Sequence, residues 1–338
     1  MDFYFSFIVP VYNRPNEVLE LLESLSKQTY DKSFEIVLIE DGSTISSENI
    51  VERYASTLNI AYYKKLNSGP GDSRNYGMRR AKGTYFIVLD SDCIIPPQYL
   101  EVANKSLQEN FVHCYGGPDA AHESFSTIQK AINYAMTSLF TTGGIRGNKN
   151  AVDKFQPRSF NMGISKEAFN TVGGYGNIHP GEDPDLTIRI WNKGYTTKLI
   201  PEAYVYHKRR IDWNKFYIQV NKFGMVRPIL NKWHPGTSKI TYWFPTLFCL
   251  GFILAISSAL FGFWLPMALY LFYFLALFLH SLAQNKNVSV AALSLVAVAI
   301  QFTGYGYGFL KSTFWINFSK KKPKELFPKL FFKKSSIL

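Results

Sequence analysis

Acidic residues at the ends of predicted strands are the first candidates for chemistry. Asp90 and Asp92 follow the apolar run 84–89 and are separated by one residue. In an extended chain, residues two apart point the same way, so both carboxylates could share one divalent cation. Mg²⁺ and Mn²⁺ prefer oxygen ligands, and a metal there would neutralise charge on a departing diphosphate. The alternative is a solvated acidic turn, because an isolated D-x-D is a weak signal.

A second acidic turn could hold a nucleoside. Glu40-Asp41-Gly42-Ser43 follows the apolar run 34–39, and the first apolar run ends in Pro10-Val11-Tyr12-Asn13. Asp41 could accept hydrogen bonds from a base or a ribose, and Tyr12 could stack on a nucleobase. The turn is explained without a ligand if its aspartate or serine caps the helix that follows.

The glycine-containing segment 67–75 leads into a predicted helix. It offers Arg74, whose fork of donors suits a diphosphate, whereas we expect Asp72 to cap the helix. The sequence contains neither G-x-x-x-x-G-K-[ST] nor a strand-following G-x-G-x-x-G. It therefore predicts neither a P-loop nor a dinucleotide-binding fingerprint.

A third acidic group, Glu182-Asp183-Pro184-Asp185, opens a predicted helix that runs to about residue 193. Pro184 suits the first helical position, which favours Asp183 as the N-cap. Alternatively, Asp183 or Glu182 removes a proton from an attacking hydroxyl group, as a carboxylate within hydrogen-bond reach can. His207 follows the apolar run 203–206 and could complete a metal shell, although a surface histidine fits the pattern equally well.

Short apolar runs that alternate with helix-like stretches must position these groups. Runs at 3–9, 34–39, 60–63 and 84–89 predict buried strands, and stretches at 16–28, 46–58 and 72–81 predict helices. This alternation indicates an α/β fold whose mostly parallel sheet carries helices on both faces. In such sheets ligands bind beyond the carboxyl ends of the strands, which is where the acidic turns fall.

The last third of the chain has a different composition. Between Lys239 and Lys311 the only Asp, Glu, Lys or Arg is Lys286, and apolar segments at about 243–263, 265–283 and 288–310 are long enough to span a membrane. Three crossings would put the basic tail outside, against the positive-inside tendency. Two crossings plus a re-entrant or interfacial third segment would keep it inside, and the sequence leaves both arrangements open.

Charge and cysteine content indicate a cytosolic domain at a membrane surface. The net charge is +12, and much of the basic excess flanks the apolar block, which favours anionic lipid over nucleic acid as a partner. Segment 213–233 places apolar residues at helical spacing between Lys and Arg, which favours an interfacial helix over a core-packing one. The three cysteines form neither a disulfide framework nor a zinc pattern, and the N-terminus lacks the features of a secretory signal.

Taken together and in order, these motifs resemble family 2 of the inverting glycosyltransferases, which have the GT-A fold. The resemblance covers residues 4 to about 210. It is carried by residues 10–13 (PVYN), 41–43 (DGS), 67–75 (NSGPGDSRN), 81–85 (AKGTY), 90–92 (DSD), 173–175 (GGY) and 182–186 (EDPDL).

The resemblance implies a role for each candidate. The implied donor-binding residues are Pro10, Tyr12, Asp41, Arg74 and Asp90. The implied ligands of a divalent cation, Mg²⁺ or Mn²⁺, are Asp92, Asp90 and His207. Asp183, with Glu182 beside it, is the implied general base, and inversion at the anomeric carbon follows. Glu40 stands where the family more usually has an aspartate, which leaves its role open.

The expected function is transfer of a single sugar from a nucleotide-diphosphate sugar, with a UDP-sugar favoured, to a membrane-associated, lipid-linked acceptor in surface polysaccharide or glycan biosynthesis. Processive synthases of the family carry a Q-x-x-R-W sequence, which does not occur here. A polyprenyl-phosphate sugar synthase is the alternative within the same chemistry, and a non-catalytic nucleotide-binding membrane scaffold is the alternative of another class. We expect no nucleic-acid partner.

The composition also predicts how the chain is organised. We expect a catalytic domain over residues 1–210, an amphipathic interfacial helix region over 211–240, transmembrane segments over 241–310 and a basic cytoplasmic tail over 311–338. The expected location is the inner or plasma membrane, with the catalytic domain in the cytoplasm.

Overall fold

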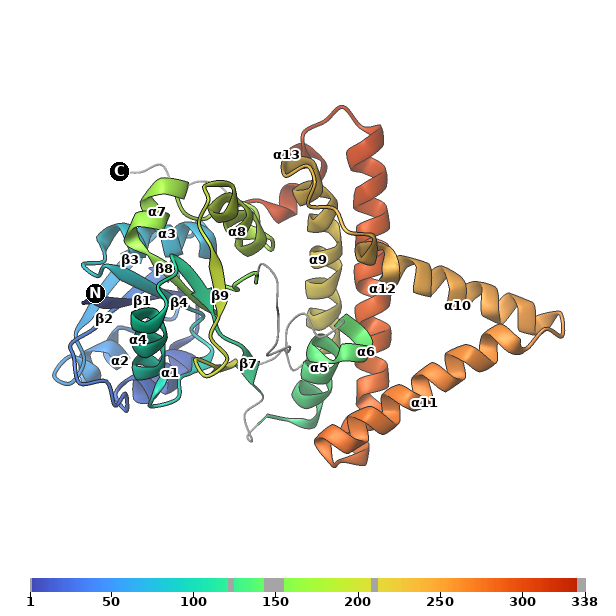
Figure 1. Cartoon of the computed structure of the whole chain (residues 1–338), viewed down its shortest axis with the longest axis horizontal. Helices are drawn as coiled ribbons and strands as arrows, with labels where there is room; N and C mark the ends of the chain where they lie inside the picture. Colours follow the sequence, from blue (N-terminus) through green and yellow to red (C-terminus); the bar gives the residue numbers. More distant parts are fainter. Residues whose placement is uncertain (1, 121–124, 143–154, 208–211, 333–338) are drawn as a thin grey trace. The chain divides into compact units, whose positions relative to one another are not determined.

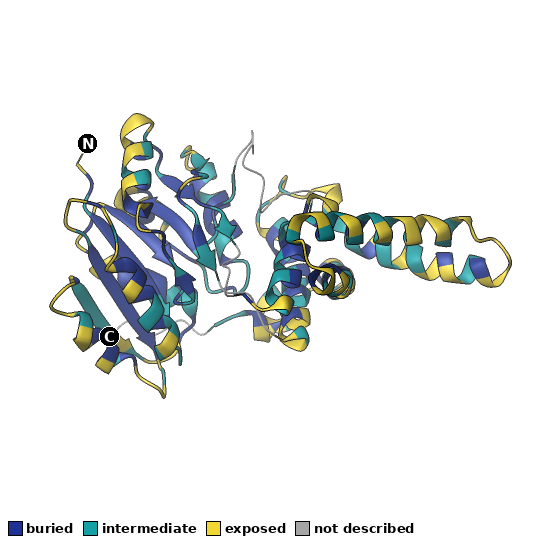
Figure 2. Cartoon of the chain, turned by 90° about the horizontal axis from the view of Figure 1, so that it is seen from below, coloured by how far each residue is buried: buried dark blue, intermediate teal, exposed yellow. Residues whose placement is uncertain are grey.

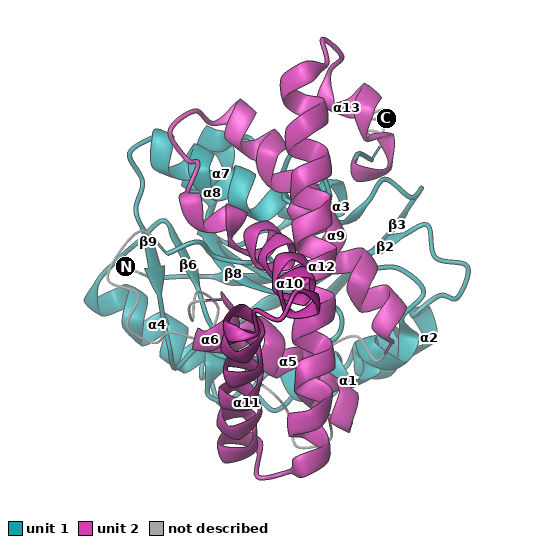
Figure 3. Cartoon of the chain, turned by 90° about the vertical axis from the view of Figure 1, so that its right-hand side faces the viewer, with its two compact units in different colours: residues 1–122, 148–207, 331–338 teal, residues 123–147, 208–330 magenta. Residues whose placement is uncertain are grey.

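The computed structural model describes residues 2–120, 125–142, 155–207 and 212–332. The chain forms two compact units, which are coloured separately in Figure 3. The sheet unit comprises residues 1–122, 148–207 and 331–338, and the helical unit comprises residues 123–147 and 208–330. The chain therefore leaves the sheet unit twice and returns to it both times.

A seven-stranded sheet with the order β3-β2-β1-β4-β8-β6-β9 forms the centre of the sheet unit. Its strands are β1 (Phe5–Val11), β2 (Glu35–Asp41), β3 (Ile60–Lys65), β4 (Tyr85–Leu89), β6 (Cys114–Gly116), β8 (Asn161–Ser165) and β9 (Thr197–Leu199). β3, β2, β1 and β4 run parallel, β8 is antiparallel to β4 and β6, and β6 pairs in parallel with β9. The predicted mostly parallel α/β sheet is confirmed.

Helices cover both faces of this sheet because successive side chains of its strands point to opposite sides. On β1, Phe7 and Val9 belong to one apolar cluster and Ile8 belongs to the other. Figure 2 shows the central strands of the sheet as buried, whereas the edge strands β3 and β9 are mostly of intermediate burial. The helices of this unit are α1 (Pro15–Leu25), α2 (Glu48–Tyr54), α3 (Pro70–Arg80), α4 (Tyr99–Glu109), α7 (Lys166–Val172) and α8 (Glu182–Asn192).

A small second sheet lies beside the acidic D-x-D sequence. It consists of β5 (Cys93–Ile94), β10 (Val205–His207) and β7 (Asp119–Ala120), in the order β5-β10-β7. β5 and β10 are antiparallel, and Cys93 is paired directly with His207. This pairing places the predicted histidine next to the residues that follow the fourth strand of the large sheet.

The helical unit is built around α12 (Val288–Phe318), which packs against α5, α9, α10 and α11. The other helices are α5 (Thr127–Thr137), α6 (Leu139–Thr142), α9 (Trp213–Trp233), η1 (Ile240–Trp243), α10 (Phe244–Leu260), α11 (Leu265–Asn285), α13 (Pro323–Leu326) and η2 (Pro328–Leu330). Segments 240–260, 265–285 and 288–318 are each long and apolar enough to cross a membrane. The three predicted apolar segments are therefore helices of sufficient length, and the functional domain boundaries at 210, 240 and 310 stay predictions.

Two predicted helix caps are wrong. α8 begins at Glu182 with Gly181 as its N-cap, so Asp183 lies inside the first turn. α3 begins at Pro70 with Gly69 as its N-cap, so Asp72 also lies inside a first turn. The preceding glycines adopt φ values of 114° and 92°, a conformation that other residues rarely adopt, and they start each helix earlier than the acidic residue.

Candidate active site

Arg74 joins two of the predicted acidic groups. Its Nη2 donates to Asp90 Oδ1 at 2.7 Å, and its Nη1 donates to Glu182 Oε1 at 3.1 Å. Burial lowers the pKa of Arg74, but the carboxylates of Asp90 and Glu182 raise it more, so the pKa lies above its ordinary value. The guanidinium therefore stays charged and fixes the end of β4 relative to the start of α8.

His207 lies against both aspartates of the D-x-D sequence. Its Nε2 is 3.2 Å from Asp92 Oδ1 and 3.8 Å from Asp90 Oδ2. The ring stacks on Phe160, with ring centroids 4.9 Å apart and planes 15° apart. This stacking orients the imidazole from one side, while its nitrogen faces the carboxylates.

These groups suit a hard or borderline divalent cation. Ligand atoms of Asp92, Cys93 and His207 lie within 4.8 Å of one another. The Cys93 thiol donates to the carbonyl oxygen of Phe160 at 3.4 Å, and burial raises its pKa. Oxygen and imidazole donors fit Mn²⁺ or Mg²⁺, so Asp92, Asp90 and His207 could hold such an ion.

Asp41 is held at the end of β2 by the entrance of α3. Its Oδ1 accepts from the amide of Ser68 and its Oδ2 from the amide of Gly69, both at 2.9 Å. Lys65 Nζ, at the end of β3, pairs with Asp41 Oδ1 at 2.5 Å. Asp41 does not cap α2, whose N-cap is Ser47. The carboxylate is buried and held by these contacts. Its contact with a nucleoside stays a prediction.

The end of β1 is tied to the end of β2. Asn13 adopts φ = 52°, its amide donates to Ser43 Oγ at 2.9 Å, and its Oδ1 accepts from the amide of Thr44 at 2.8 Å. The Tyr12 side chain, one residue before, is 54% exposed. Its ring is therefore accessible to a ligand. Pro10, two residues earlier on β1, is half-buried. Their donor-binding roles stay predictions.

Glu182 and Asp183 have different electrostatic surroundings. Glu182 Oε1 also contacts His179 Nδ1 at 2.9 Å. Burial raises the pKa of Glu182, but His179 and Arg74 lower it more, to about 2. Burial and the neighbouring Glu182 charge raise the pKa of Asp183. The ion pairs occupy Glu182, which leaves Asp183 as the carboxylate better suited to accept a proton.

A segment far along the chain packs against this site. The amide of Phe332 donates to the carbonyl oxygen of Asn177 at 3.0 Å, and Phe331 forms an antiparallel bridge with Ile178. The Phe332 ring also lies against Gly69 and, with centroids 5.8 Å apart, against His179. Residues 331–332 therefore contact both the loop that binds Asp41 and the loop before Asp183.

The contacts connect most of the candidates into one network. Asp90, Asp92, His207, Arg74 and Glu182 are linked directly, and Asp41 is linked through the entrance of α3. Sequence reasoning missed Lys65, His179 and Phe332, and it included Ser68 in the motif 67–75 without giving it a role. Lys65 could have been found as a strand-end residue, whereas His179 and Phe332 lie in no motif and are recognised only by their contacts.

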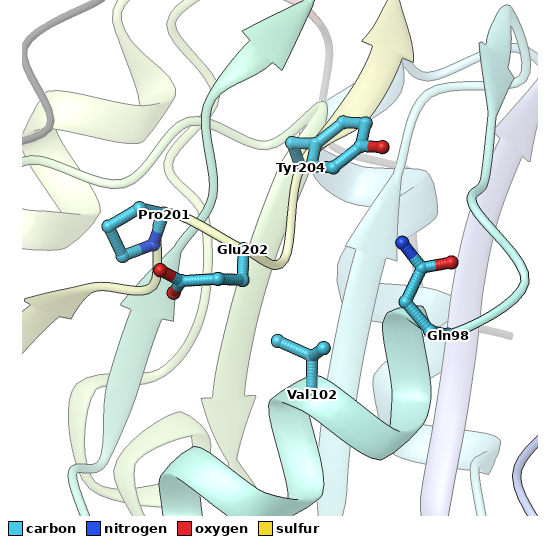
Figure 4. A pocket seen from close by; sticks show the side chains of 5 residues that line it. All are labelled: Gln98, Val102, Pro201, Glu202 and Tyr204. Carbon is cyan, nitrogen blue, oxygen red and sulfur yellow. The ribbon is translucent and has the colours of Figure 1, made fainter.

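A separate pocket of about 400 Å³ lies between the start of α4 and the connection from β9 to β10 (Figure 4). It is lined by Gln98, Val102, Pro201, Glu202 and Tyr204. None of these residues belongs to the network around Arg74, and no sequence motif singled them out.

Comparison with known proteins agrees with this geometry. The family described as Glycosyl transferase family 2 matches residues 6–173. An uncharacterized glycosyltransferase of Rickettsia bellii is 33% identical over 144 residues, which are 42% of this chain and 19% of that protein. Poly(ribitol-phosphate) beta-N-acetylglucosaminyltransferase TarS of Staphylococcus aureus is 38% identical over 109 residues, 31% of this chain and 19% of TarS. The matches span about a fifth of these relatives' lengths.

The fold has a counterpart among solved structures. The mannosyltransferase PcManGT from Pyrobaculum calidifontis, in complex with GDP-Man and Mn²⁺, superimposes with a TM-score of 0.60 at 17% identity. The match covers 90% of this chain and 88% of that one. This likeness supports the GT-A fold. The family match leads to one assignment: residues 6–173 form a glycosyl transferase family 2 domain.

Proposed function

We propose that the chain is an inverting glycosyltransferase that adds a single sugar from a nucleotide-diphosphate sugar to a lipid-linked acceptor in surface glycan biosynthesis. The observation that carries this proposal is the bridge that Arg74 makes between Asp90 and Glu182, next to Asp183. It connects the predicted donor and metal side of the site with the predicted base. The name of TarS describes transfer of N-acetylglucosamine to poly(ribitol-phosphate), which supports sugar transfer as the activity.

In the proposed reaction, an acceptor hydroxyl oxygen attacks the anomeric carbon of the donor. The bond from that carbon to the diphosphate oxygen breaks, and the diphosphate leaves with the electron pair. The hydroxyl proton passes to the Asp183 carboxylate, whose raised pKa makes it a stronger base than an ordinary aspartate. Glu182 acts as a positioning residue, because its charge is held by Arg74 and His179.

A divalent cation, when held by Asp92, Asp90 and His207, would supply positive charge to the departing diphosphate. The residues of the chain do the rest. Arg74 offers a second cationic group close to Asp90. Tyr12 and Asp41 bind the nucleoside from the ends of β1 and β2. A site at the plasma membrane, with the sheet unit in the cytoplasm, would give the enzyme access to both a soluble donor and a lipid-linked acceptor.

Donor binding tests the first half of this proposal. The purified chain in detergent is heated with Mn²⁺ and a panel of UDP-, GDP- and dTDP-sugars. A donor at 100 times its Kd stabilises the folded state by about 2.7 kcal/mol and raises the melting temperature accordingly. We expect a UDP-sugar to give this shift. A panel without any stabilising sugar, combined with no release of nucleoside diphosphate, contradicts the proposal.

The Asp183→Asn variant tests the role of the base. It keeps the shape of the side chain but cannot accept the proton, so we expect transfer to fall by about 10²–10⁴-fold while the donor-induced thermal shift remains. Asp185→Asn is the matched control, because Asp185 lies in the same turn but binds Arg189. Unchanged transfer by Asp183→Asn would favour a phosphate acceptor, as in a polyprenyl-phosphate sugar synthase.

A further inference from the structure

The two ends of the helical block of residues 208–330 are joined to the same unit of the chain. Before the block, β10 lies in the sheet unit and ends at His207. After it, Phe331 and Phe332 return to the sheet unit and make main-chain contacts with Ile178 and Asn177. Both junctions must therefore lie on the same side of any membrane that the block enters.

This return determines whether the number of membrane crossings is even or odd. A chain that leaves one side of a membrane and comes back to that side has crossed it an even number of times. Three apolar helices, α10, α11 and α12, lie between the two junctions. They cannot all cross, so one of them differs from the other two.

α10 and α11 are the pair with the most apolar surface left uncovered. Only 17% and 11% of their most apolar windows are buried within the protein, against 39% for α12. Leu254 on α10 and Phe272 on α11 are 68% and 71% exposed. The two helices run away from α12 and meet at residues 261–264 (Figure 1). Such a surface is suited to the acyl chains of lipids.

The flanks of this hairpin carry charge and its interior does not. Residues 240–285 contain no Asp, Glu, Lys or Arg, whereas Lys239 precedes them and Lys286 follows them. Each limb has about 21 residues, which at about 1.5 Å per residue match a hydrocarbon core of about 30 Å. Both basic flanks would then lie on the side where the hairpin begins.

α12 is covered by helices that carry polar and charged groups. Ala297, Val298 and Phe302 of α12 pack in one cluster with Phe216 of α9 and Ile132 of α5. α9 contains four Lys or Arg residues: Lys215, Lys222, Arg227 and Lys232.

 α9 packs against α12, so its basic side chains would move with α12. A crossing by α12 would carry these side chains toward the hydrocarbon, which is costly.

We propose that α10 and α11 enter the bilayer together as a hairpin and that α12 stays at the membrane surface on the side of the sheet unit. The partner of the hairpin is the lipid bilayer itself. The hairpin adjoins α12 in the helical unit. Residues 331–332, which follow this unit in the chain, contact the loop before Asp183. The arrangement does not depend on which sugar the enzyme transfers.

Cysteine labelling tests this arrangement in sealed membrane vesicles of known orientation, with a membrane-impermeant maleimide. Three single substitutions at exposed positions report the three relevant places: Glu109→Cys in the sheet unit, Ser289→Cys at the start of α12 and Lys321→Cys after its end. The parent chain is the control, because Cys93 and Cys114 are buried and Cys249 lies in α10. A thermal transition equal to that of the parent in detergent establishes that each variant is folded.

We expect all three cysteines to react from the same face of the membrane and to be protected from the other face. Labelling of Ser289→Cys and Lys321→Cys from opposite faces would mean that α12 crosses, which overturns the proposal. Labelling of Glu109→Cys from one face and of both other cysteines from the opposite face would mean an odd number of crossings before α12. That result overturns it as well.

Discussion

Arg74 and Glu182 lie 108 residues apart in the sequence and form a buried ion pair of 3.1 Å. The same guanidinium binds Asp90 at 2.7 Å through its other terminal nitrogen. One rigid fork therefore sets the spacing between the end of β4 and the beginning of α8. Lysine carries its charge on one nitrogen at the end of a flexible chain, so it cannot hold two carboxylates in this geometry.

The Arg74→Lys variant should therefore fold but transfer sugar poorly. Displacement of reacting groups by about 1 Å costs about 10²-fold in rate, so we expect a loss of that order in kcat. The measurement is steady-state transfer beside donor binding. Arg80→Lys on the same helix is the control, because Arg80 is exposed and packs on Tyr76 rather than on a carboxylate. Equal activity of the two variants would contradict the role given to Arg74.

Removal of the imidazole at position 207 should weaken metal binding. His207→Ala takes away one of three proposed ligands, so we expect the apparent affinity for Mn²⁺ to fall by about tenfold or more. The measurement is the thermal shift with increasing Mn²⁺ in the absence of donor. His113→Ala is the matched control, because His113 contacts Ser165 instead of the D-x-D aspartates. A Mn²⁺ titration that is the same for both variants argues against His207 as a ligand.

The sequence predicted those parts of the site that follow from local rules. Asp41, Asp90 and Asp92 were expected at the carboxyl ends of buried strands, and the structure places them at the ends of β2 and β4. Apolar runs identify parallel strands well, because these strands are buried on both faces. The apolar stretch between Lys239 and Lys311, interrupted only by Lys286, likewise predicted the three apolar helices.

The remaining features depend on contacts between distant segments. Nothing near Phe332 in the sequence indicates that it packs against Gly69 and His179. α5 lies between strands of the sheet unit in the sequence, yet it packs on α12 in the helical unit. Its contact surface contains Tyr134, whose hydroxyl contacts His280 at 2.8 Å. Such pairings arise from tertiary packing and leave no periodic signal in one sequence.

The pair of His179 and Glu182 should make stability depend on pH. Burial lowers the pKa of His179, but Glu182 raises it more, so the folded chain holds this proton more tightly than the unfolded chain. The stabilisation is complete below the ordinary pKa of 6.5 and disappears as the pH rises through the higher folded value. The contribution of Glu182 is complete above its ordinary pKa of 4.5 and is lost as the pH falls toward about 2.

The His179→Gln variant should therefore lose most stability, relative to the parent, between the ordinary pKa values of 4.5 and 6.5. The difference should shrink at alkaline pH, where the parent has also lost the imidazolium charge. Melting temperatures measured across the pH range check this. The same substitution in a Glu182→Gln background is the control, and it should give a much flatter difference. A pH-independent difference in both backgrounds would mean that His179 acts only by packing.

Close packing of α9 on α12 should make Gly224 intolerant of a side chain. A Cβ at this position would collide with the carbonyl oxygen of Tyr305 and lie 2.8 Å from the amide nitrogen of Phe309. Alanine favours a helix over glycine by about 1 kcal/mol, but overpacking costs about 1–3 kcal/mol. Backbone atoms cannot rotate away as a side chain can, so we expect Gly224→Ala to lose up to about 2 kcal/mol net. Lys215→Ala, at an exposed position of the same helix, is the control and should leave the melting temperature in detergent nearly unchanged. If Gly224→Ala is instead the more stable variant, the helices are not packed at backbone contact.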